Sequence, residues 1–473
     1  MNFSAQRAPN HPFEKTTTML KILNPANNTL IKELPDDSAE SIADKYAAAR
    51  AAQKTWRATP IKERIACLQR FRGLVADRME PLAKTLTAEM GKPIRQARSE
   101  LNGLLPRIDF FCDRVAESIK HEAHLTSGDT HEWITHEPLG VIANISAWNY
   151  PYFVGGNVFV PALLTGNAVL YKPSEFATLT GLAIGALLHQ AGVPRDVFQV
   201  IVGTGAAGAA LLEQPINGVF FTGSYATGKR IAEAVAGRMV KLQLELGGKD
   251  PSYVCEDVNV ERAATGTADG AFYNAGQSCC SVERIYVHSK IYNDFIDSFV
   301  HEVENFVVGD PMDDKTYIGP LTRAAQLNVL EHQIADAKAK GARVLHGGQR
   351  IPGPGSYFAP TVLANVNHTM EVMREESFGP IIGIQKVKND EEALTLMNDS
   401  NYGLTASVYT RDQSRAEKIL SQVNAGTAYW NCCDRVSPRL PWSGVGHSGV
   451  GLTLSHYGIQ TFCRPKAWHL RAA

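Results

Sequence analysis

Polar or glycine residues stand at the ends of five predicted strands in the middle of the chain, where they could form a ligand site. The strands are short β-rich runs between residues 139 and 247, separated by helix-length segments dense in Ala, Leu and Gly. This pattern is typical of parallel strands joined by helices, and in open sheets of that kind the ligand lies beyond the carboxyl ends of the strands. The residues at those ends are Asn149, Lys172, Gly203, Gly223 with Ser224, and Glu245 followed by Gly247 and Gly248.

The glycines after the third strand could bind the pyrophosphate of a dinucleotide. Gly203, Gly205 and Gly208 match the G-x-G-x-x-G pattern between a strand and a helix. The acid that usually follows about 20 residues later, to bind the adenosine ribose, is missing. A tight turn with small residues that let the helix pack closely explains the glycines equally well.

Two other strand ends offer a different way to hold the same ligand. The turn Thr222-Gly223-Ser224 could offer backbone amides and a hydroxyl to phosphates, and Lys172 with Glu175 could bind two ribose hydroxyls. These residues predict a dinucleotide that crosses the sheet in an unusual way.

The eight cysteines do not form a disulfide framework or a zinc site. They contain no C-x-x-C pair and no Cys/His cluster with zinc spacing; the positions are 67, 112, 255, 279, 280, 432, 433 and 463. The ordinary expectation for each is a buried, reduced and unreactive thiol, so a reactive cysteine needs further evidence.

The composition favours a small-molecule partner. The chain has 473 residues, enough for two or three domains, with 44% hydrophobic and 20% charged residues. Its formal net charge of −1 gives no field that would hold it on nucleic acid or on an anionic membrane.

The first 20 residues are polar and predict a loose tail, without the features of a secretory or transit peptide. No apolar stretch approaches the roughly 18 residues of a membrane span, and we expect a cytoplasmic protein.

The elements around these motifs follow from periodicity. Residues 38–57 and 61–90 have apolar side chains three and four apart, which predicts helices interrupted at Pro60. Residues 121–136 and the C-terminal run TFCRPKAWHL look like strands that would be unstable alone.

Six motifs together resemble the NAD(P)-dependent aldehyde dehydrogenase superfamily, in its non-acylating, hydrolytic type. They occur in that family's order with comparable gaps: AWNYP (147–151), YKPSE (171–175), FTGS (221–224), LELGGKDP (244–251), FYNAGQSCC (272–280) and EESFGP (375–380). The likeness extends over nearly the whole chain from about residue 22.

The resemblance implies a catalytic cysteine, a general base and an oxyanion donor. Cys279 would be the nucleophile, Glu245 the base that activates water, and Asn149 the side-chain half of the oxyanion hole. A thiolate adds readily to an aldehyde, and the resulting oxyanion is stabilised by preorganised donors. The thioester left after hydride transfer to nicotinamide must be hydrolysed, and the acid at 245 favours a free carboxylic acid product. No metal is implied.

The resemblance also assigns cofactor residues. Lys172 and Glu175 would hold the adenosine ribose, Ser224 the pyrophosphate, and Glu376 with Phe378 the nicotinamide side; Gly203, Gly223 and Trp148 are further candidates. A carboxylate at the ribose would repel a 2′-phosphate, so NAD is expected in preference to NADP.

The implied architecture is α/β, with a Rossmann-like doubly wound parallel sheet, a second α/β domain and a small β element. The dinucleotide-binding domain would comprise residues 21–120 and 140–246, and the catalytic domain residues 247–458. Residues 121–139 and 459–473 would form an oligomerisation element, which in the family pairs with neighbouring subunits. We therefore expect a homodimer or homotetramer.

The aldehyde itself is not identified by the sequence. Aromatic pocket candidates favour an apolar or aromatic aldehyde, whereas two arginines could bind the carboxylate of a semialdehyde; the candidates are Tyr152, Phe153, Trp430, Trp442, Arg435 and Arg439. Tyr225, His447 and the pair Leu452-Thr453 depart from the residues that are usual in the family. A thiol hydrolase or acyltransferase without a redox step, and an inactive binding protein on the same scaffold, remain as alternatives.

Overall fold

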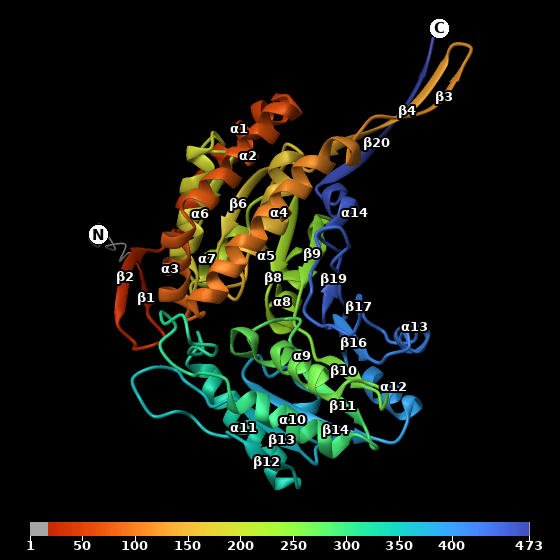
Figure 1. Ribbon diagram of the computed structural model, residues 1–473. Coiled ribbons are helices and arrows are strands. Elements are labelled where there is room, and N and C mark those ends of the chain that lie inside the picture. The colour runs from red at the N-terminus through yellow and green to blue at the C-terminus, as the bar shows by residue number, and fades with distance from the viewer. Residues whose placement is uncertain (1–17, 473) are drawn as a thin grey trace, which may run out of the picture.

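Two sheets with helices packed against them form the body of the molecule, and a long β-ribbon projects from it (Figure 1). The structure is a computed structural model that describes residues 18–472. Residues 1–17 of the predicted tail therefore lie outside the described part. Strand β1 (Met19–Leu23) begins within that predicted stretch and pairs with β2 (Leu30–Pro35).

The first sheet contains the five strands predicted from the sequence. Its order is β19-β9-β8-β5-β6-β7, in which the last five strands are parallel and β19 is antiparallel to β9. The bounds are β5 (Val141–Ile145), β6 (Ala168–Lys172), β7 (Phe198–Val200), β8 (Gly218–Thr222), β9 (Lys241–Glu245) and β19 (Gly449–Val450). From β5 the chain continues to β6 and β7 on one side, and it then returns to β8 and β9 on the other side. The strand order therefore reverses between β5 and β8, and a crevice is expected there at the carboxyl ends of the strands.

Helices cover both faces of this sheet because alternate strand residues point to opposite sides. Val141 and Ala143 pack into one core with α1 (Ala39–Ala58), α7 (Gly205–Leu212) and α8 (Tyr225–Val235). Ile142 packs into the other with α2 (Ile61–Asp77), α3 (Met79–Met90), α4 (Ile94–Ser118), α5 (Pro151–Leu164) and α6 (Thr178–Gln190). The predicted helices and their interruption at Pro60 are present.

The second sheet has seven strands in the order β12-β13-β14-β11-β10-β16-β17, parallel except for the β12–β13 pair. The strands are β10 (Asp250–Val254), β11 (Val282–His288), β12 (Arg343–His346), β13 (Thr361–Ala364), β14 (Ile381–Val387), β16 (Thr405–Tyr409) and β17 (Thr427–Trp430). Its helices are α9 (Val260–Phe272), α10 (Tyr292–Glu304), α11 (Ala325–Ala339), α12 (Asp390–Asn398) and α13 (Gln413–Leu420). The α/β class with two parallel-sheet units is thus confirmed.

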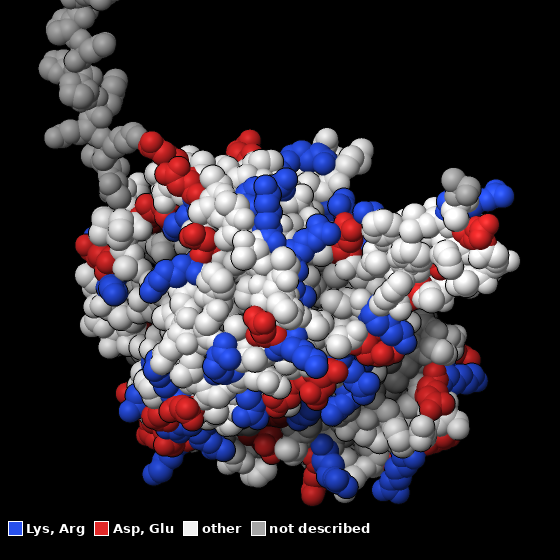
Figure 2. Space-filling view, turned by 90° about the horizontal axis from the view of Figure 1, so that it is seen from above, with Lys and Arg blue, Asp and Glu red and all other residues white. Residues whose placement is uncertain are grey.

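The projecting ribbon is a three-stranded antiparallel sheet in the order β20-β4-β3. It joins β3 (Glu122–Ser127) and β4 (Thr130–Pro138) to the C-terminal β20 (Cys463–Arg471), and the rings of Trp133 and Trp468 stack across it 6.0 Å apart. Both predicted strand regions therefore lie in one sheet. Figure 2 shows basic and acidic side chains interspersed over one face of the body, with few on the ribbon.

Short elements complete the chain. They are β15 (Tyr402–Gly403), β18 (Val445–Gly446), α14 (Ser455–Gln460) and the single turns η1 (Ala236–Arg238), η2 (Tyr273–Gly276) and η3 (Glu371–Met373). Within residues 18–472, every helix is too short or too polar to cross a membrane.

Candidate functional site

Two adjoining cavities meet at Cys279. The larger, of about 950 Å³, lies at the carboxyl ends of β5, β6 and β8, and the smaller, of about 480 Å³, lies beside α4 and α5. Cys279 lines both of them, whereas Glu245 lines the smaller and Asn149 the larger. The chain therefore places one thiol between two chambers with different walls.

The loop before Cys279 is held in an unusual backbone conformation. Asn274, Ala275 and Gly276 have φ values of 54°, 56° and 68°, in the left-handed region that side chains rarely adopt. A Cβ on Gly276 would lie 2.3 Å from the carbonyl oxygen of Gly379, so only glycine fits there. The backbone N–H of Asn274 donates to Gln96 Oε1 of α4 at 2.9 Å. These contacts hold the loop that leads into β11, and they thereby fix the position of the Cys279 thiol.

The amide of Asn149 is oriented by that same loop. Its Nδ2 donates to the carbonyl oxygen of Gln277 at 3.1 Å, and the side chain is 4% exposed. An amide nitrogen carries two hydrogens, so the second remains for an oxygen bound next to Cys279. This arrangement suits an oxyanion donor.

Glu245 is the last residue of β9, and its side chain lines the smaller cavity. Burial raises the pKa of its carboxyl to about 7, while hydrogen bonds from Thr453 and Gln243 and the charge of Arg107 lower it. Thr453 Oγ1 and Gln243 Nε2 both donate to Oε1, the latter at 3.1 Å. A carboxyl with a pKa near neutrality can both accept and release a proton. Thr453, which the sequence analysis singled out, is thus a direct partner of the Glu245 carboxyl.

The larger cavity has the side chains that a dinucleotide needs. Within the described residues 18–472, Lys172 Nζ donates to the carbonyl oxygen of Pro173 alone, at 3.1 Å, and the Glu175 carboxylate accepts from Ser174 Oγ alone, at 3.3 Å. Ser224 caps the N-terminus of α8, where backbone N–H groups can meet phosphate. The residues present therefore fit a bound NAD or NADP at this site.

The glycine prediction needs a correction. Gly205 and Gly208 line the larger cavity, together with Gly223, but Gly203 does not. Gly203 ends the loop after β7 with φ 143°, and a Cβ there would lie 2.8 Å from Ala207. Its role is to allow the tight turn into α7.

Glu376 and Phe378 lie on the loop between η3 and β14 and line the larger cavity together with Cys279. Burial raises the pKa of Glu376 to about 8, and its Oε1 accepts the backbone N–H of Gly248 at 3.1 Å. Phe378 meets the ring of Trp148 edge-on at 5.5 Å. The backbone N–H groups of Ser377 and Phe378 donate to Glu283, which pairs with buried Lys249 at 2.7 Å.

Three of the six predicted pocket residues line the smaller cavity, namely Phe153, Trp442 and Arg435. Tyr152 does not, because its side chain is fully buried in the core between α5 and its neighbouring helices. Trp430 is 39% exposed at the end of β17, where its Nε1 donates to Thr410. Arg439 lies exposed on the loop beyond the cavity. Neither cavity is lined by Tyr152, Trp430 or Arg439, and their part in substrate binding stays a prediction.

Several lining residues were missed by the sequence interpretation. Tyr150, the N-cap of α5, and Val154 and Asn157 in that helix lie on the same face as Phe153, and α4 presents Gln96, Glu100, Gly103 and Arg107 in the same way. Helical periodicity was the signal that could have found both sets. Asp434 accepts the thiol of Cys280 at 2.9 Å, and burial raises the pKa of Asp434.

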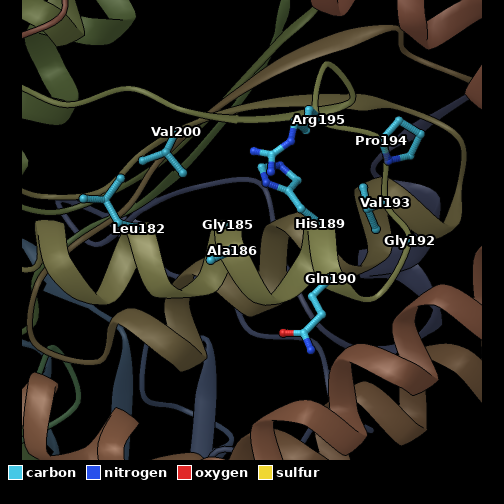
Figure 3. A pocket seen from close by; sticks show the side chains of 10 residues that line it. All are labelled: Leu182, Gly185, Ala186, His189, Gln190, Gly192, Val193, Pro194, Arg195 and Val200. Atoms are coloured by element: carbon cyan, nitrogen blue, oxygen red, sulfur yellow. The ribbon is translucent and has the colours of Figure 1, made fainter.

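The described residues offer no metal site, and a further hollow of the molecule lies apart from the predicted site residues. Among residues 18–472, no group of His, Cys, Asp and Glu side chains is arranged to hold a metal ion. A separate hollow lies along α6 and the loop after it, and none of the predicted site residues lines it (Figure 3).

Comparison with known proteins gives a consistent result over almost the whole chain. A family model described as the aldehyde dehydrogenase family matches residues 13–468. A 3,6-anhydro-alpha-L-galactose dehydrogenase from Vibrio sp. (strain EJY3) is 33% identical over 456 residues, which is 95% of each chain.

Solved structures agree with these relatives. A 3,6-anhydro-L-galactose dehydrogenase in complex with NAP has a TM-score of 0.93 at 33% identity, covering 97% of each chain. PnpE in complex with nicotinamide adenine dinucleotide has a TM-score of 0.93 at 32% identity, covering 96% of this chain and 94% of that one.

Proposed function

We propose that this chain, which belongs to the aldehyde dehydrogenase family and is an aldehyde-oxidising oxidoreductase, works through a thioester on Cys279 that Glu245 hydrolyses to a free carboxylic acid. The observation that carries the proposal is that Cys279 lines both cavities while Glu245 lines the smaller. The thiol can thus meet an aldehyde on one side and a nicotinamide on the other.

In the first step the thiolate form of Cys279 adds to the aldehyde, so that a carbon–sulfur bond forms while the carbonyl π electrons move to oxygen. The carbonyl oxygen becomes an oxyanion, to which the free hydrogen of the Asn149 amide and the backbone N–H of Cys279 can donate. Bound NAD supplies the acceptor for the hydride that leaves this carbon. The carbon then remains on Cys279 as a thioester.

Glu245 serves the second step. Its carboxylate takes a proton from water, the water oxygen bonds to the thioester carbon, and the carbon–sulfur bond breaks to release the acid and the thiolate. A carboxyl with a pKa near 7 is suited to this proton transfer. A hydrolase without a redox step would have no use for Lys172, Glu175 and the larger cavity.

NAD is the proposed cofactor in preference to NADP. Glu175 lies in the larger cavity beside Lys172, and its negative charge at the ribose opposes a 2′-phosphate. Family relatives are known with either dinucleotide, as the structures in complex with NAP and with nicotinamide adenine dinucleotide illustrate.

We also propose the domain division given above and a role for the ribbon in assembly. Residues 21–120 and 140–246 would bind the dinucleotide, and 247–458 would carry the nucleophile, with β19 crossing back to the first sheet. The ribbon leaves Leu125 and Leu470 about half exposed, at 44% and 45%. A homodimer or homotetramer would cover them. The cytoplasmic location stays a prediction from the sequence.

Replacement of the nucleophile tests the proposal. Cys279→Ala removes the sulfur that holds the substrate, so NADH formation should fall to background while NAD binding, followed by protein fluorescence, stays close to that of the wild type. Cys280→Ala is the matched control and should keep turnover, because the Cys280 thiol bonds to Asp434. Turnover in the first variant, or its loss only in the second, would refute the assignment.

A further inference from the structure

A buried arginine in the smaller cavity has donors that the protein does not use. Arg107 is 6% exposed, lines that cavity and makes one hydrogen bond, from Nη1 to Asn157 Oδ1 at 2.9 Å. A guanidinium has five N–H donors. Among residues 18–472, Arg107 forms no ion pair, although a buried charge without a partner is costly.

Glu245 lines the same cavity and interacts with Arg107 through its charge, and three other neighbouring carboxylates are already bound by other groups. Glu100 pairs with buried Lys92 and accepts the backbone N–H groups of Tyr152 and Phe153. Asp269 accepts the hydroxyl of Tyr317 at 2.6 Å and pairs with Arg435 at 3.7 Å, while Asp434 accepts the thiol of Cys280. Within residues 18–472, Arg107 therefore leaves most of its donors unused although it is buried, whereas Arg435 is exposed to solvent at the cavity mouth.

The guanidinium is held in place for a ligand. It lies over the ring of Phe153, 4.1 Å from the centroid, while Asn157 fixes one end. Gly103, one helical turn before Arg107, leaves the room that Phe153 occupies, since a Cβ there would lie 2.6 Å from the ring. Burial lowers the pKa of Arg107 to about 10, so the group is protonated at neutral pH.

We propose that the substrate is an aldehyde with a carboxylate at its far end, which Arg107 binds while the aldehyde carbon meets Cys279. A planar guanidinium matches a carboxylate through two parallel hydrogen bonds. The wall between the two ends is aromatic, from Tyr150, Phe153 and Trp442, so the middle of the substrate is apolar. This inference names the substrate class of the proposed function and rests on it.

The experiment compares three benzaldehydes that differ only at the para position. They carry a carboxylate, a carboxamide or a trimethylammonium group, and kcat/KM is measured with saturating NAD. The expected order is carboxylate, then carboxamide, then trimethylammonium, with the first exceeding the second by roughly 10- to 100-fold, as expected for charge-assisted hydrogen bonds in a buried site. A preference for the cation, or no preference, would overturn the proposal while leaving aldehyde oxidation intact. Absence of NADH with all three and with short alkanals would instead contradict the proposed function.

Arg107→Gln tests the residue itself. The ratio of kcat/KM for carboxylate over carboxamide should fall about tenfold or more, chiefly through KM for the carboxylate. Arg439→Gln, on the exposed loop, is the control and should keep the wild-type ratio. If Arg107→Gln lowers kcat equally for both aldehydes or shifts the pH profile of both, then Arg107 acts on Glu245 and the proposal fails. Arg107→Lys keeps the charge and should restore part of the ratio, which separates a specific effect from misfolding.

Discussion

At the residue scale, the proton on Glu245 decides when the second half of the reaction can run. Its pKa is raised to about 7 by burial, and only the ionised form can accept a proton from water. Where hydrolysis limits turnover, the steady-state rate should therefore rise with pH through about 7. The hydrogen bond from Thr453 favours the ionised form, because it donates to the carboxylate.

Thr453→Val removes that donor and keeps the shape of the side chain. The pKa of Glu245 should rise, so the midpoint of the pH–rate profile should move to higher pH and the rate at neutral pH should fall. Steady-state NADH formation at saturating aldehyde and NAD, measured across the pH range, checks this. Thr461→Val alters a surface threonine on the turn after α14 and should leave the midpoint in place. A midpoint that stays or moves down in Thr453→Val contradicts the role given to this contact.

The residues predicted from the sequence were those whose motifs are local. Asn149, Glu245 and Cys279 each stand in a short run of distinctive residues, and the folded chain gathers them at the two cavities. Tyr152 does not line the cavity, whereas Phe153 does, because neighbouring side chains on a helix point about 100° apart. Arg107 was missed because α4 lies far from the other site residues in sequence and carries no motif of its own.

At the scale of elements, the buried carboxylate of Glu89 joins helix α3 to helix α6, which lies next to the Lys172–Glu175 segment. Glu89, near the end of α3, accepts the backbone N–H groups of Leu179 and Thr180 at the start of α6, at 2.8 and 2.6 Å. These N–H groups have no partner within their own helix. Helix α6 begins at Thr178, shortly after the Lys172–Glu175 segment, so Glu89 fixes the helix to which that segment leads.

Glu89→Ala should lower the free energy of unfolding by about 1–3 kcal/mol, because buried N–H groups lose their acceptor. Glu89→Gln keeps an acceptor oxygen and should cost less. Denaturant unfolding of both variants and the wild type measures the difference. Equal stability of Glu89→Ala and the wild type would show that the contact contributes nothing.

The strands and helices with clear periodicity were predicted well from the sequence, but the pairing of strands that are distant in the sequence was not. The five strands of the first sheet were found from alternation with helices, whereas the pairing of β19 with β9 joins residues about 200 positions apart. Likewise, β4 and β20 were recognised as strands, yet nothing local specifies that residues 463–471 pair with 130–138. Such pairings depend on the packing of the whole chain.

At the scale of the whole molecule, the projecting ribbon is the feature that a single subunit does not explain. A thin sheet that stands away from the body buries little of its own surface, and three strands need a covered apolar face to be stable. We expect wild-type protein to sediment as a dimer or tetramer. Leu125→Glu puts a charge on the exposed ribbon and should shift the assembly toward smaller species at micromolar concentration.

Met312→Glu provides the matched control, since Met312 is 41% exposed and lies beside the start of α4, at the end of that helix opposite to the ribbon. It should leave the sedimentation coefficient unchanged. A wild-type protein that sediments as a monomer, or an assembly that is insensitive to Leu125→Glu, would contradict the ribbon's role.

The central claim is that Cys279 carries a thioester which Glu245 hydrolyses, and rapid mixing of Glu245→Gln with aldehyde and NAD tests it most directly. Glutamine cannot accept the proton, so the first turnover should release about one equivalent of NADH per subunit, followed by a steady rate roughly 10²- to 10⁴-fold below that of the wild type. A progress curve without a burst, or a steady rate equal to that of the wild type, would contradict the account.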